Sequence, residues 1–131
     1  MPAVRILVVA PDPRARELLG LAVRSIERRV GEPLELLEAP DGDRGARLAL
    51  RERPDVVIAE EIASRAGAFS LARTLRDAPD PYRGVIVILL ERKHDAWLAR
   101  WAGADAWFVK PVDPFELADR VLELTAEEDR V

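Results

Sequence analysis

The chain has 131 residues, a formal net charge of −4 at pH 7, no cysteine and one histidine. Its length predicts a single domain, its 49% hydrophobic and 34% charged residues are typical of a soluble globular protein, and the missing cysteines exclude disulfides, thiolate metal sites and cysteine nucleophiles. The net negative charge gives no reason to expect binding to nucleic acid, and without a signal peptide or an apolar run near the roughly 20 residues that span a bilayer, we expect a cytoplasmic protein without membrane association.

The first half of the chain alternates short apolar runs with longer segments of helical period. A strand is predicted over Ile6–Val9, and Asp12 and Pro13 then supply the N-cap and the first residue of a helix that runs to Val30. Two further strands and two further helices follow, namely strands over 34–37 and 56–59 and helices over 41–52 and 63–76.

The second half continues this alternation. The longest apolar run, Val85–Leu90, predicts a fourth strand, and residues 106–109 predict a fifth, with a short helix over 95–102 between them. Asp113 is the expected N-cap of the last helix, and Glu116 stands three residues later, as in a capping box.

Five strands that alternate with helices indicate an α/β fold. The strands are continuous apolar runs, which is typical of strands buried on both faces, so we expect a parallel sheet between two layers of helices. The domain is expected to cover residues 1–125, with an acidic tail over 126–131.

Charged residues follow three of the predicted strands. Asp12 comes after the first strand, Glu60 and Glu61 after the third, and Lys110 after the fifth. Because ligands of an open parallel sheet bind beyond the carboxyl ends of its strands, this edge is the candidate site. We expect Glu60 to be neutralised by Lys110, and Asp12 to be turned away as a helix cap.

Five stretches, taken together, resemble a response-regulator receiver domain from end to end: ILVVAPDP, RPDVVIAE, VIVILL, AGADAWFVKP and DPFEL. The resemblance implies a flavodoxin-like (βα)5 fold, with a doubly wound five-stranded parallel sheet in the order 2-1-3-4-5. It also implies a phosphorylation site. In the family, two acids after strand one bind Mg²⁺, an aspartate after strand three takes a phosphoryl group from a histidine kinase, and a Thr or Ser and a lysine contact that group. The lysine precedes a proline, and the bond between them is cis.

This sequence departs from the family pattern at most of those positions. The departures are Ala10 and Pro11 at the acid positions, with Asp12 beside them, Glu60 at the phosphoacceptor position, and Ile88 or Leu89 at the hydroxyl position. Lys110 is retained, and Trp107 stands at the family's aromatic switch position. We expect Mg²⁺ binding to be lost, because Ala10 and Pro11 offer no side-chain oxygen. Glutamate also carries its carboxylate about 1.5 Å further out than aspartate, which in-line attack tolerates poorly.

These departures favour a pseudo-receiver, which is a non-catalytic domain of two-component-type signal transduction that acts by phosphorylation-independent protein–protein interaction. Two other functions stay open: a receiver phosphorylated on Glu61 or another carboxylate, and a small-molecule-binding regulatory domain that uses the vacated, more apolar pocket. A purely structural interpretation also stays open, in which Glu60 and Glu61 are solvated strand ends and Lys110 only tethers its strand.

All three tryptophans fall in the predicted fourth helix and fifth strand. Trp97 and Trp101 are four residues apart on one helical face, and we expect one of them to pack inward. In the family, helix four, strand five and helix five form a common docking and dimer surface. We therefore expect Trp97, Trp101 and Trp107 to mark a surface for a kinase, an output protein or a second copy of the chain.

Overall fold

The computed structural model describes residues 4–61 and 67–129. The strands are β1 (Arg5–Val9), β2 (Glu35–Ala39), β3 (Val56–Glu60), β4 (Val85–Leu90) and β5 (Ala106–Val109). The helices are α1 (Pro13–Val30), α2 (Gly42–Glu52), α3 (Ala68–Asp77), α4 (Ala96–Ala102) and α5 (Pro114–Asp129), with a 3₁₀ turn, η1 (Lys93–Asp95), before α4.

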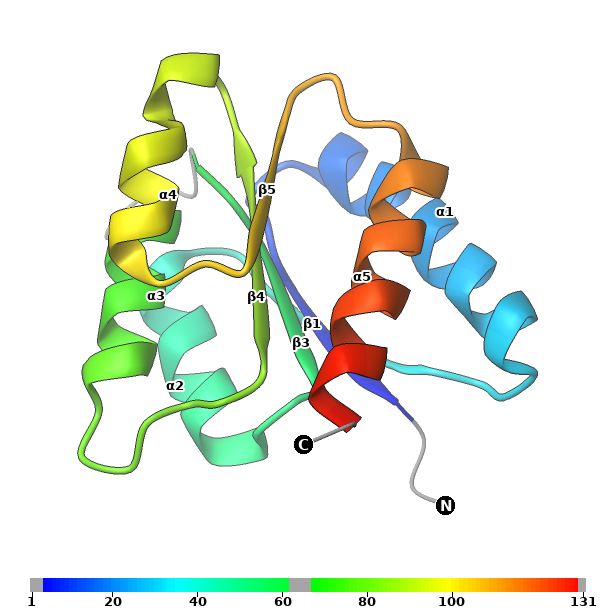
Figure 1. Cartoon of the computed structure of the whole chain (residues 1–131), viewed down its shortest axis with the longest axis horizontal. Coiled ribbons are helices and arrows are strands. Elements are labelled where there is room, and N and C mark those ends of the chain that lie inside the picture. Colours follow the sequence, from blue (N-terminus) through cyan, green and yellow to red (C-terminus); the bar gives the residue numbers. More distant parts are fainter. Residues whose placement is uncertain (1–3, 62–66, 130–131) are drawn as a thin grey trace.

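The five strands form one parallel sheet in the order β2-β1-β3-β4-β5. Helices α1 and α5 cover one face of the sheet, and α2, α3 and α4 cover the other (Figure 1). This arrangement confirms the predicted fold and strand order. None of the helices in the described part of the chain is both long and apolar enough to cross a membrane.

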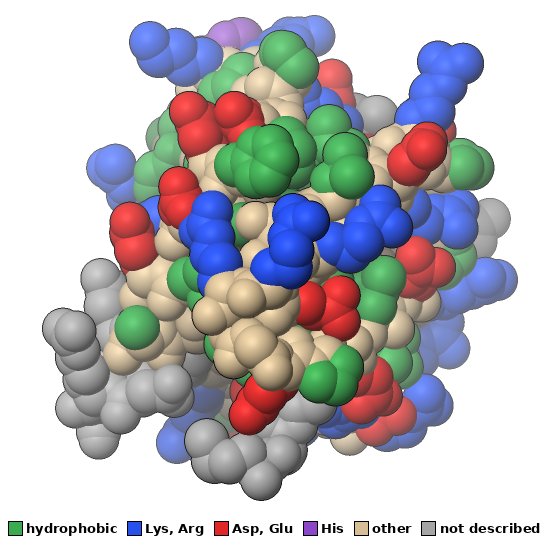
Figure 2. All heavy atoms as spheres, turned by 90° about the vertical axis from the view of Figure 1, so that its right-hand side faces the viewer, with side chains coloured by type: hydrophobic (Ala, Val, Ile, Leu, Met, Phe, Trp, Pro, Cys, Tyr) green, Lys and Arg blue, Asp and Glu red, His purple; other side chains and the backbone are tan. Residues whose placement is uncertain are grey.

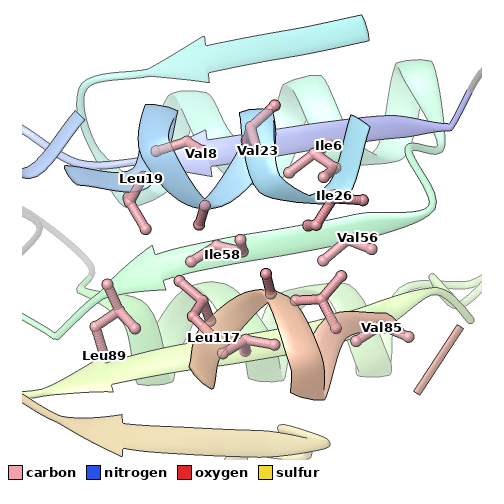
Figure 3. Packing of buried hydrophobic residues seen from close by; sticks show 14 of the residues in the cluster. Ile6, Val8, Leu19, Val23, Ile26, Val56, Ile58, Val85, Leu89 and Leu117 are labelled. Carbon is pink, nitrogen blue, oxygen red and sulfur yellow. The ribbon is translucent and has the colours of Figure 1, made fainter. Parts of the chain in front are cut away.

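Successive strand residues point into two separate hydrophobic cores. Ile6 and Val8 of β1 pack with α1 and α5 in the core shown in Figure 3, whereas Leu7 and Val9 pack under α2 and α3 on the other face. All of these side chains are at most 2% exposed. The strands are continuous apolar runs because both of their faces are buried.

Aspartates begin three of the helices, as the sequence predicts for Asp12 and Asp113. An Oδ1 atom of Asp12 accepts from the backbone N–H of Arg14 at 2.9 Å, and Asp113 accepts from that of Phe115 at 2.8 Å. Asp41 caps α2 in the same way. Each cap satisfies an N–H group that has no partner within its own helix.

Several boundaries differ from prediction. Helix α3 begins at Ala68, and the predicted start at residue 63 lies outside the described residues. Helix α5 continues to Asp129, which lies within the segment 126–131 that was expected to be an acidic tail. Strand β2 begins one residue later and ends two residues later than predicted, and its first residue, Glu35, pairs with Arg5.

The expectation that Trp97 or Trp101 packs inward is wrong. Their exposed fractions are 65% and 58%, and the buried residues of α4 are Ala99 and Ala102. Alanine leaves α4 close against the core beneath it, where an indole ring has no room.

Candidate functional site

Glu60 is the last residue of β3, and it is buried. It lies opposite Leu89 of β4, and its side chain is 1% exposed. The interpretation of Glu60 as a solvated strand end is therefore wrong. Its Oε2 atom lies 3.2 Å from Nζ of Lys110, which confirms the expected ion pair. Neither of its carboxylate oxygens accepts a hydrogen bond of regular geometry within the described residues.

Lys110 has a second and closer carboxylate partner. Its Nζ donates to Oε1 of Glu91 at 2.7 Å, while its backbone N–H donates to the carbonyl of Leu90. Burial lowers the pKa of the Lys110 ammonium, but the carboxylates of Glu91 and Glu60 act in the opposite sense and raise the pKa above its usual value overall. The peptide bond from Lys110 to Pro111 is cis, as the family resemblance implies.

Glu91 is the residue that the sequence analysis missed. It follows β4 directly, so the rule that drew attention to Glu60 and Lys110 applies to it as well. Glu91 is exposed and follows a long apolar strand, as many surface glutamates do, so its ion pair with the ammonium of Lys110 was not predicted.

Glu61 points to a different set of partners. Its Oε2 accepts from the backbone N–H of Glu91 at 2.5 Å. Burial raises the pKa of the Glu61 carboxyl above its usual value, and a hydrogen bond with the Asp95 carboxyl raises it further, whereas the N–H of Glu91 lowers it. Glu61 therefore belongs to an acidic cluster with Asp95 and Glu91 beside η1.

The end of β1 brings no second carboxylate to Glu60. Ala10 is fully buried, and its N–H donates to the carbonyl of Ala39 at 3.1 Å. Pro11 offers no side-chain oxygen, and Asp12 caps α1, as expected. Within residues 4–61 and 67–129, no group of three or more acidic or histidine side chains is placed to hold a metal ion.

The structure distinguishes the two candidates for the hydroxyl position. Ile88 pairs with Ala59 and faces the core under α3, whereas Leu89 pairs with Glu60 and lines the cavity beside it. Leu89 is thus the residue that lies beside Glu60.

That cavity has a volume of about 420 Å³. It lies at the carboxyl edge of the sheet, between the start of α1 and the loop from β5 to α5. Its lining is mainly apolar and consists of Asp12, Arg14, Ala15, Leu18, Glu60, Leu89, Lys110, Pro111 and Val112.

The three tryptophans have different surroundings. Trp107 is half-buried against the core under α4, and the guanidinium of Arg100 lies 5.7 Å from its ring centre. Trp101 is exposed, with the guanidinium of Arg73 5.4 Å from its ring centre, and Trp97 is exposed one turn earlier. Val109 of β5 and Phe115 of α5 are also exposed, by 40% and 55%.

No family model matches the sequence. A solved structure from Chloroflexus aurantiacus, assigned as a response regulator, superposes with a TM-score of 0.83 at 24% identity, covering 95% of this chain and 99% of that one. The receiver domain of the sensor histidine kinase PA1611 of Pseudomonas aeruginosa, crystallised with a magnesium ion in its active-site cleft, gives a TM-score of 0.80 at 20% identity over 95% of this chain and 99% of that one. These likenesses support the fold.

The similar sequences carry the family assignment. The DNA-binding response regulator MtrA of Mycolicibacterium smegmatis is 34% identical over 89% of this chain, which spans about half (48%) of that protein. An uncharacterized response regulatory protein of Mycobacterium tuberculosis is 33% identical over 127 residues, which are 93% of this chain and 91% of the relative. Identity at this level, along nearly the whole of both proteins and on a sheet of order 2-1-3-4-5, shows that the chain belongs to the response-regulator receiver family.

Proposed function

We propose that this chain is a pseudo-receiver, which acts in two-component signalling by binding protein partners without a phosphorylation cycle. The observation that carries the proposal is the state of Glu60, which stands at the phosphoacceptor position. Its carboxylate is buried and paired with Lys110. A phosphoryl donor needs an open carboxylate in line with the leaving group, and this one is covered.

The residues around Glu60 also fit Mg²⁺ poorly. Mg²⁺ takes oxygen ligands in near-octahedral geometry, and Ala10 and Pro11 supply none from their side chains. Lys110 already places a positive charge 3.2 Å from the Glu60 carboxylate, and this charge would repel a doubly charged metal ion about twice as strongly as a singly charged group. Loss of Mg²⁺ binding is therefore part of the proposal.

The test is the intact mass of the protein after incubation with Mg²⁺ and acetyl phosphate. We expect no phosphoryl adduct. A receiver crystallised with magnesium, such as that of PA1611, serves as the positive control. A stoichiometric adduct that hydrolyses like an acyl phosphate would overturn the proposal in favour of the alternative function, phosphorylation on Glu61 or another carboxylate.

Restoring the acidic residues in steps provides a control within the same chain. Glu60→Asp alone is expected to leave Mg²⁺ affinity immeasurable, because the strand-one oxygens are still missing. The triple variant Ala10→Asp/Pro11→Asp/Glu60→Asp is expected to bind Mg²⁺, as measured by calorimetry. Mg²⁺ binding by the single variant would contradict the argument from the missing ligands.

We propose that partners dock on the α4–β5–α5 face, which we define here by the exposed residues Trp97, Trp101, Val109 and Phe115. Aromatic side chains are enriched in the buried centres of protein interfaces, and exposed ones in neighbouring elements are typical of a docking surface. A kinase, an output protein or a second copy of the chain would each meet this face. Trp107, which the sequence also predicts for this surface, is half-buried beneath Arg100.

Sedimentation velocity tests self-association through this face. The double variant Trp97→Ala/Trp101→Ala is expected to weaken dimerisation by at least about tenfold, because large aromatic anchors dominate interface energies. Leu21→Ala, which truncates an exposed leucine on α1, is the matched control. A wild-type chain that stays monomeric at high concentration would exclude a second copy as the partner.

A further inference from the structure

The cavity beside Glu60 has the size and lining of a small-molecule site. Its volume of about 420 Å³ falls within the range of about 300–1,000 Å³ that is typical of ligand pockets. The exposed surface of its lining is mainly apolar, although four of its nine lining residues are charged. Figure 2 shows the α1 and α5 face of the molecule, where charged side chains cover the middle and hydrophobic ones gather towards the upper end, at the carboxyl edge of the sheet.

The charges beside the cavity do not balance. Lys110 is one ammonium between two carboxylates, and it lies closer to Glu91, at 2.7 Å, than to Glu60, at 3.2 Å. Lys110 is therefore shared between two carboxylates, and among the described residues Glu60 does not have a full positive charge to itself. Asp12 and Arg14 also line the cavity, and together they add no net charge to it.

One oxygen of Glu60 has no donor among the described residues. Both of its oxygens are buried; Oε2 lies 3.2 Å from the ammonium of Lys110, whereas Oε1 accepts no hydrogen bond in the described part of the chain. A buried acceptor without a donor is unfavourable, and the great majority of buried polar groups avoid this state. A ligand that donates a hydrogen bond to Oε1 would satisfy it.

We propose that the cavity binds a small protonated amine with an apolar body. The ammonium donates to Glu60, and the apolar body lies against Leu18, Leu89 and Val112. Charges then alternate from Glu91 to Lys110, to Glu60 and to the ligand. Glu60 is among the residues that line the cavity.

Other ligand classes fit less well. A divalent cation needs several oxygen ligands, and no cluster of three suitable side chains exists in the described residues. An anion would meet the carboxylates of Glu60 and Asp12, and the ammonium of Lys110 is already engaged by Glu91. A neutral apolar molecule would fill the cavity but leave Oε1 of Glu60 without a donor.

Three probes of similar shape separate these classes: 2-phenylethylamine, 2-phenylethanol and 3-phenylpropanoate. Amide chemical shifts in ¹H–¹⁵N spectra, recorded at pH 7 as each probe is titrated, report the binding site and the affinity. We expect the amine to shift amides of α1 and of the β5–α5 loop with saturation, and to bind at least about tenfold more tightly than the alcohol. Tighter binding of the propanoate, or no saturable shift at these amides with the amine at millimolar concentration, would overturn the proposal.

Two variants test the assigned residues. Glu60→Gln is nearly isosteric and is expected to lower the affinity for the amine at least about tenfold, whereas Glu123→Gln, on the exposed surface of α5, is expected to leave it unchanged. Ala15→Leu fills the cavity without altering its charges, and it is expected to weaken binding while the Glu60–Lys110 pair stays intact. Unchanged affinity in Glu60→Gln would assign the ammonium to another carboxylate and reject the proposal. The inference does not depend on the loss of phosphorylation, which the mass measurement tests separately.

Discussion

Lys110 is the residue on which the buried carboxylate depends. Replacing it with methionine leaves Glu60 buried without its counter-ion, and we expect this to lower the free energy of unfolding by about 1–3 kcal/mol. The cost falls below that of a fully buried pair, because the Lys110 side chain is 26% exposed. Urea denaturation measures it.

Lys93, the only other lysine in the chain, supplies the control. It is exposed in η1, so Lys93→Met is expected to change the unfolding free energy by less than about 0.5 kcal/mol. The double variant Lys110→Met/Glu60→Leu is expected to recover most of the loss, because no buried charge remains. Equal stability of Lys110→Met and wild type would show that the ion pair contributes nothing.

Because of Glu61, we expect the free energy of unfolding to change with pH in the mildly acidic range. Burial and the Asp95 carboxyl raise the folded-state pKa of Glu61 above its unfolded value, so the folded state binds the extra proton. The contribution is fully present below the ordinary glutamate pKa and is lost as pH rises through the raised value. Glu61→Gln is therefore expected to be more stable than wild type at pH 7.

The measurement is the difference in unfolding free energy between Glu61→Gln and wild type, followed from pH 4 to pH 8. We expect the difference to grow as pH rises, and then to level off above the raised pKa. Glu123→Gln controls for the loss of any surface charge. A difference that shrinks as pH rises would contradict the direction of the pKa shift.

The pairing of Glu60 with Lys110 could be predicted from sequence, because parallel strands deliver the residues that follow them to one edge. The burial of Glu60 could not be predicted, because a glutamate at the end of a strand can equally face solvent. The residues that surround it, Leu89 and Lys110, are distant in the chain. The ion pair between Lys110 and Glu91 also follows from this rule, because Glu91 comes directly after β4.

Helix α4 shows what periodicity leaves open. A spacing of four residues places Trp97 and Trp101 on one face, but it does not say whether that face meets the core or the solvent. The small residues Ala99 and Ala102 take the inner positions instead. Strands β4 and β5 match their predicted limits because long apolar runs bounded by polar residues leave little choice.

The orientation of α4 leads to opposite expectations for its residues. Ala99→Leu adds a branched side chain at a site with no exposure and is expected to destabilise the protein by about 1–3 kcal/mol. Trp97→Ala removes a largely exposed ring and is expected to change the unfolding free energy by less than about 0.5 kcal/mol. Urea denaturation of both variants compares them, and a larger loss for Trp97→Ala would mean that this indole is part of the core.

The whole molecule has the usual receiver fold, but the residues at the carboxyl edge of its sheet depart from the family pattern. Continuous apolar strands and aspartate-capped helices are enough to specify the doubly wound sheet, and these features are visible in the sequence. The carboxyl edge depends on individual side chains: Ala10 and Leu89 where polar residues would serve phosphorylation, and Glu60 turned towards Lys110.

One ammonium joins the ends of three strands. Glu60 ends β3, Glu91 follows β4 and Lys110 follows β5. The two ion pairs of Lys110 therefore link β5 to its neighbour β4 and, across β4, to β3, where the loops begin. The loops that leave these strands therefore share one anchor, and local opening of any of them must first release it. Amide hydrogen exchange at this edge should be slow and correlated among the three strand ends, and it should become faster and independent in Lys110→Met.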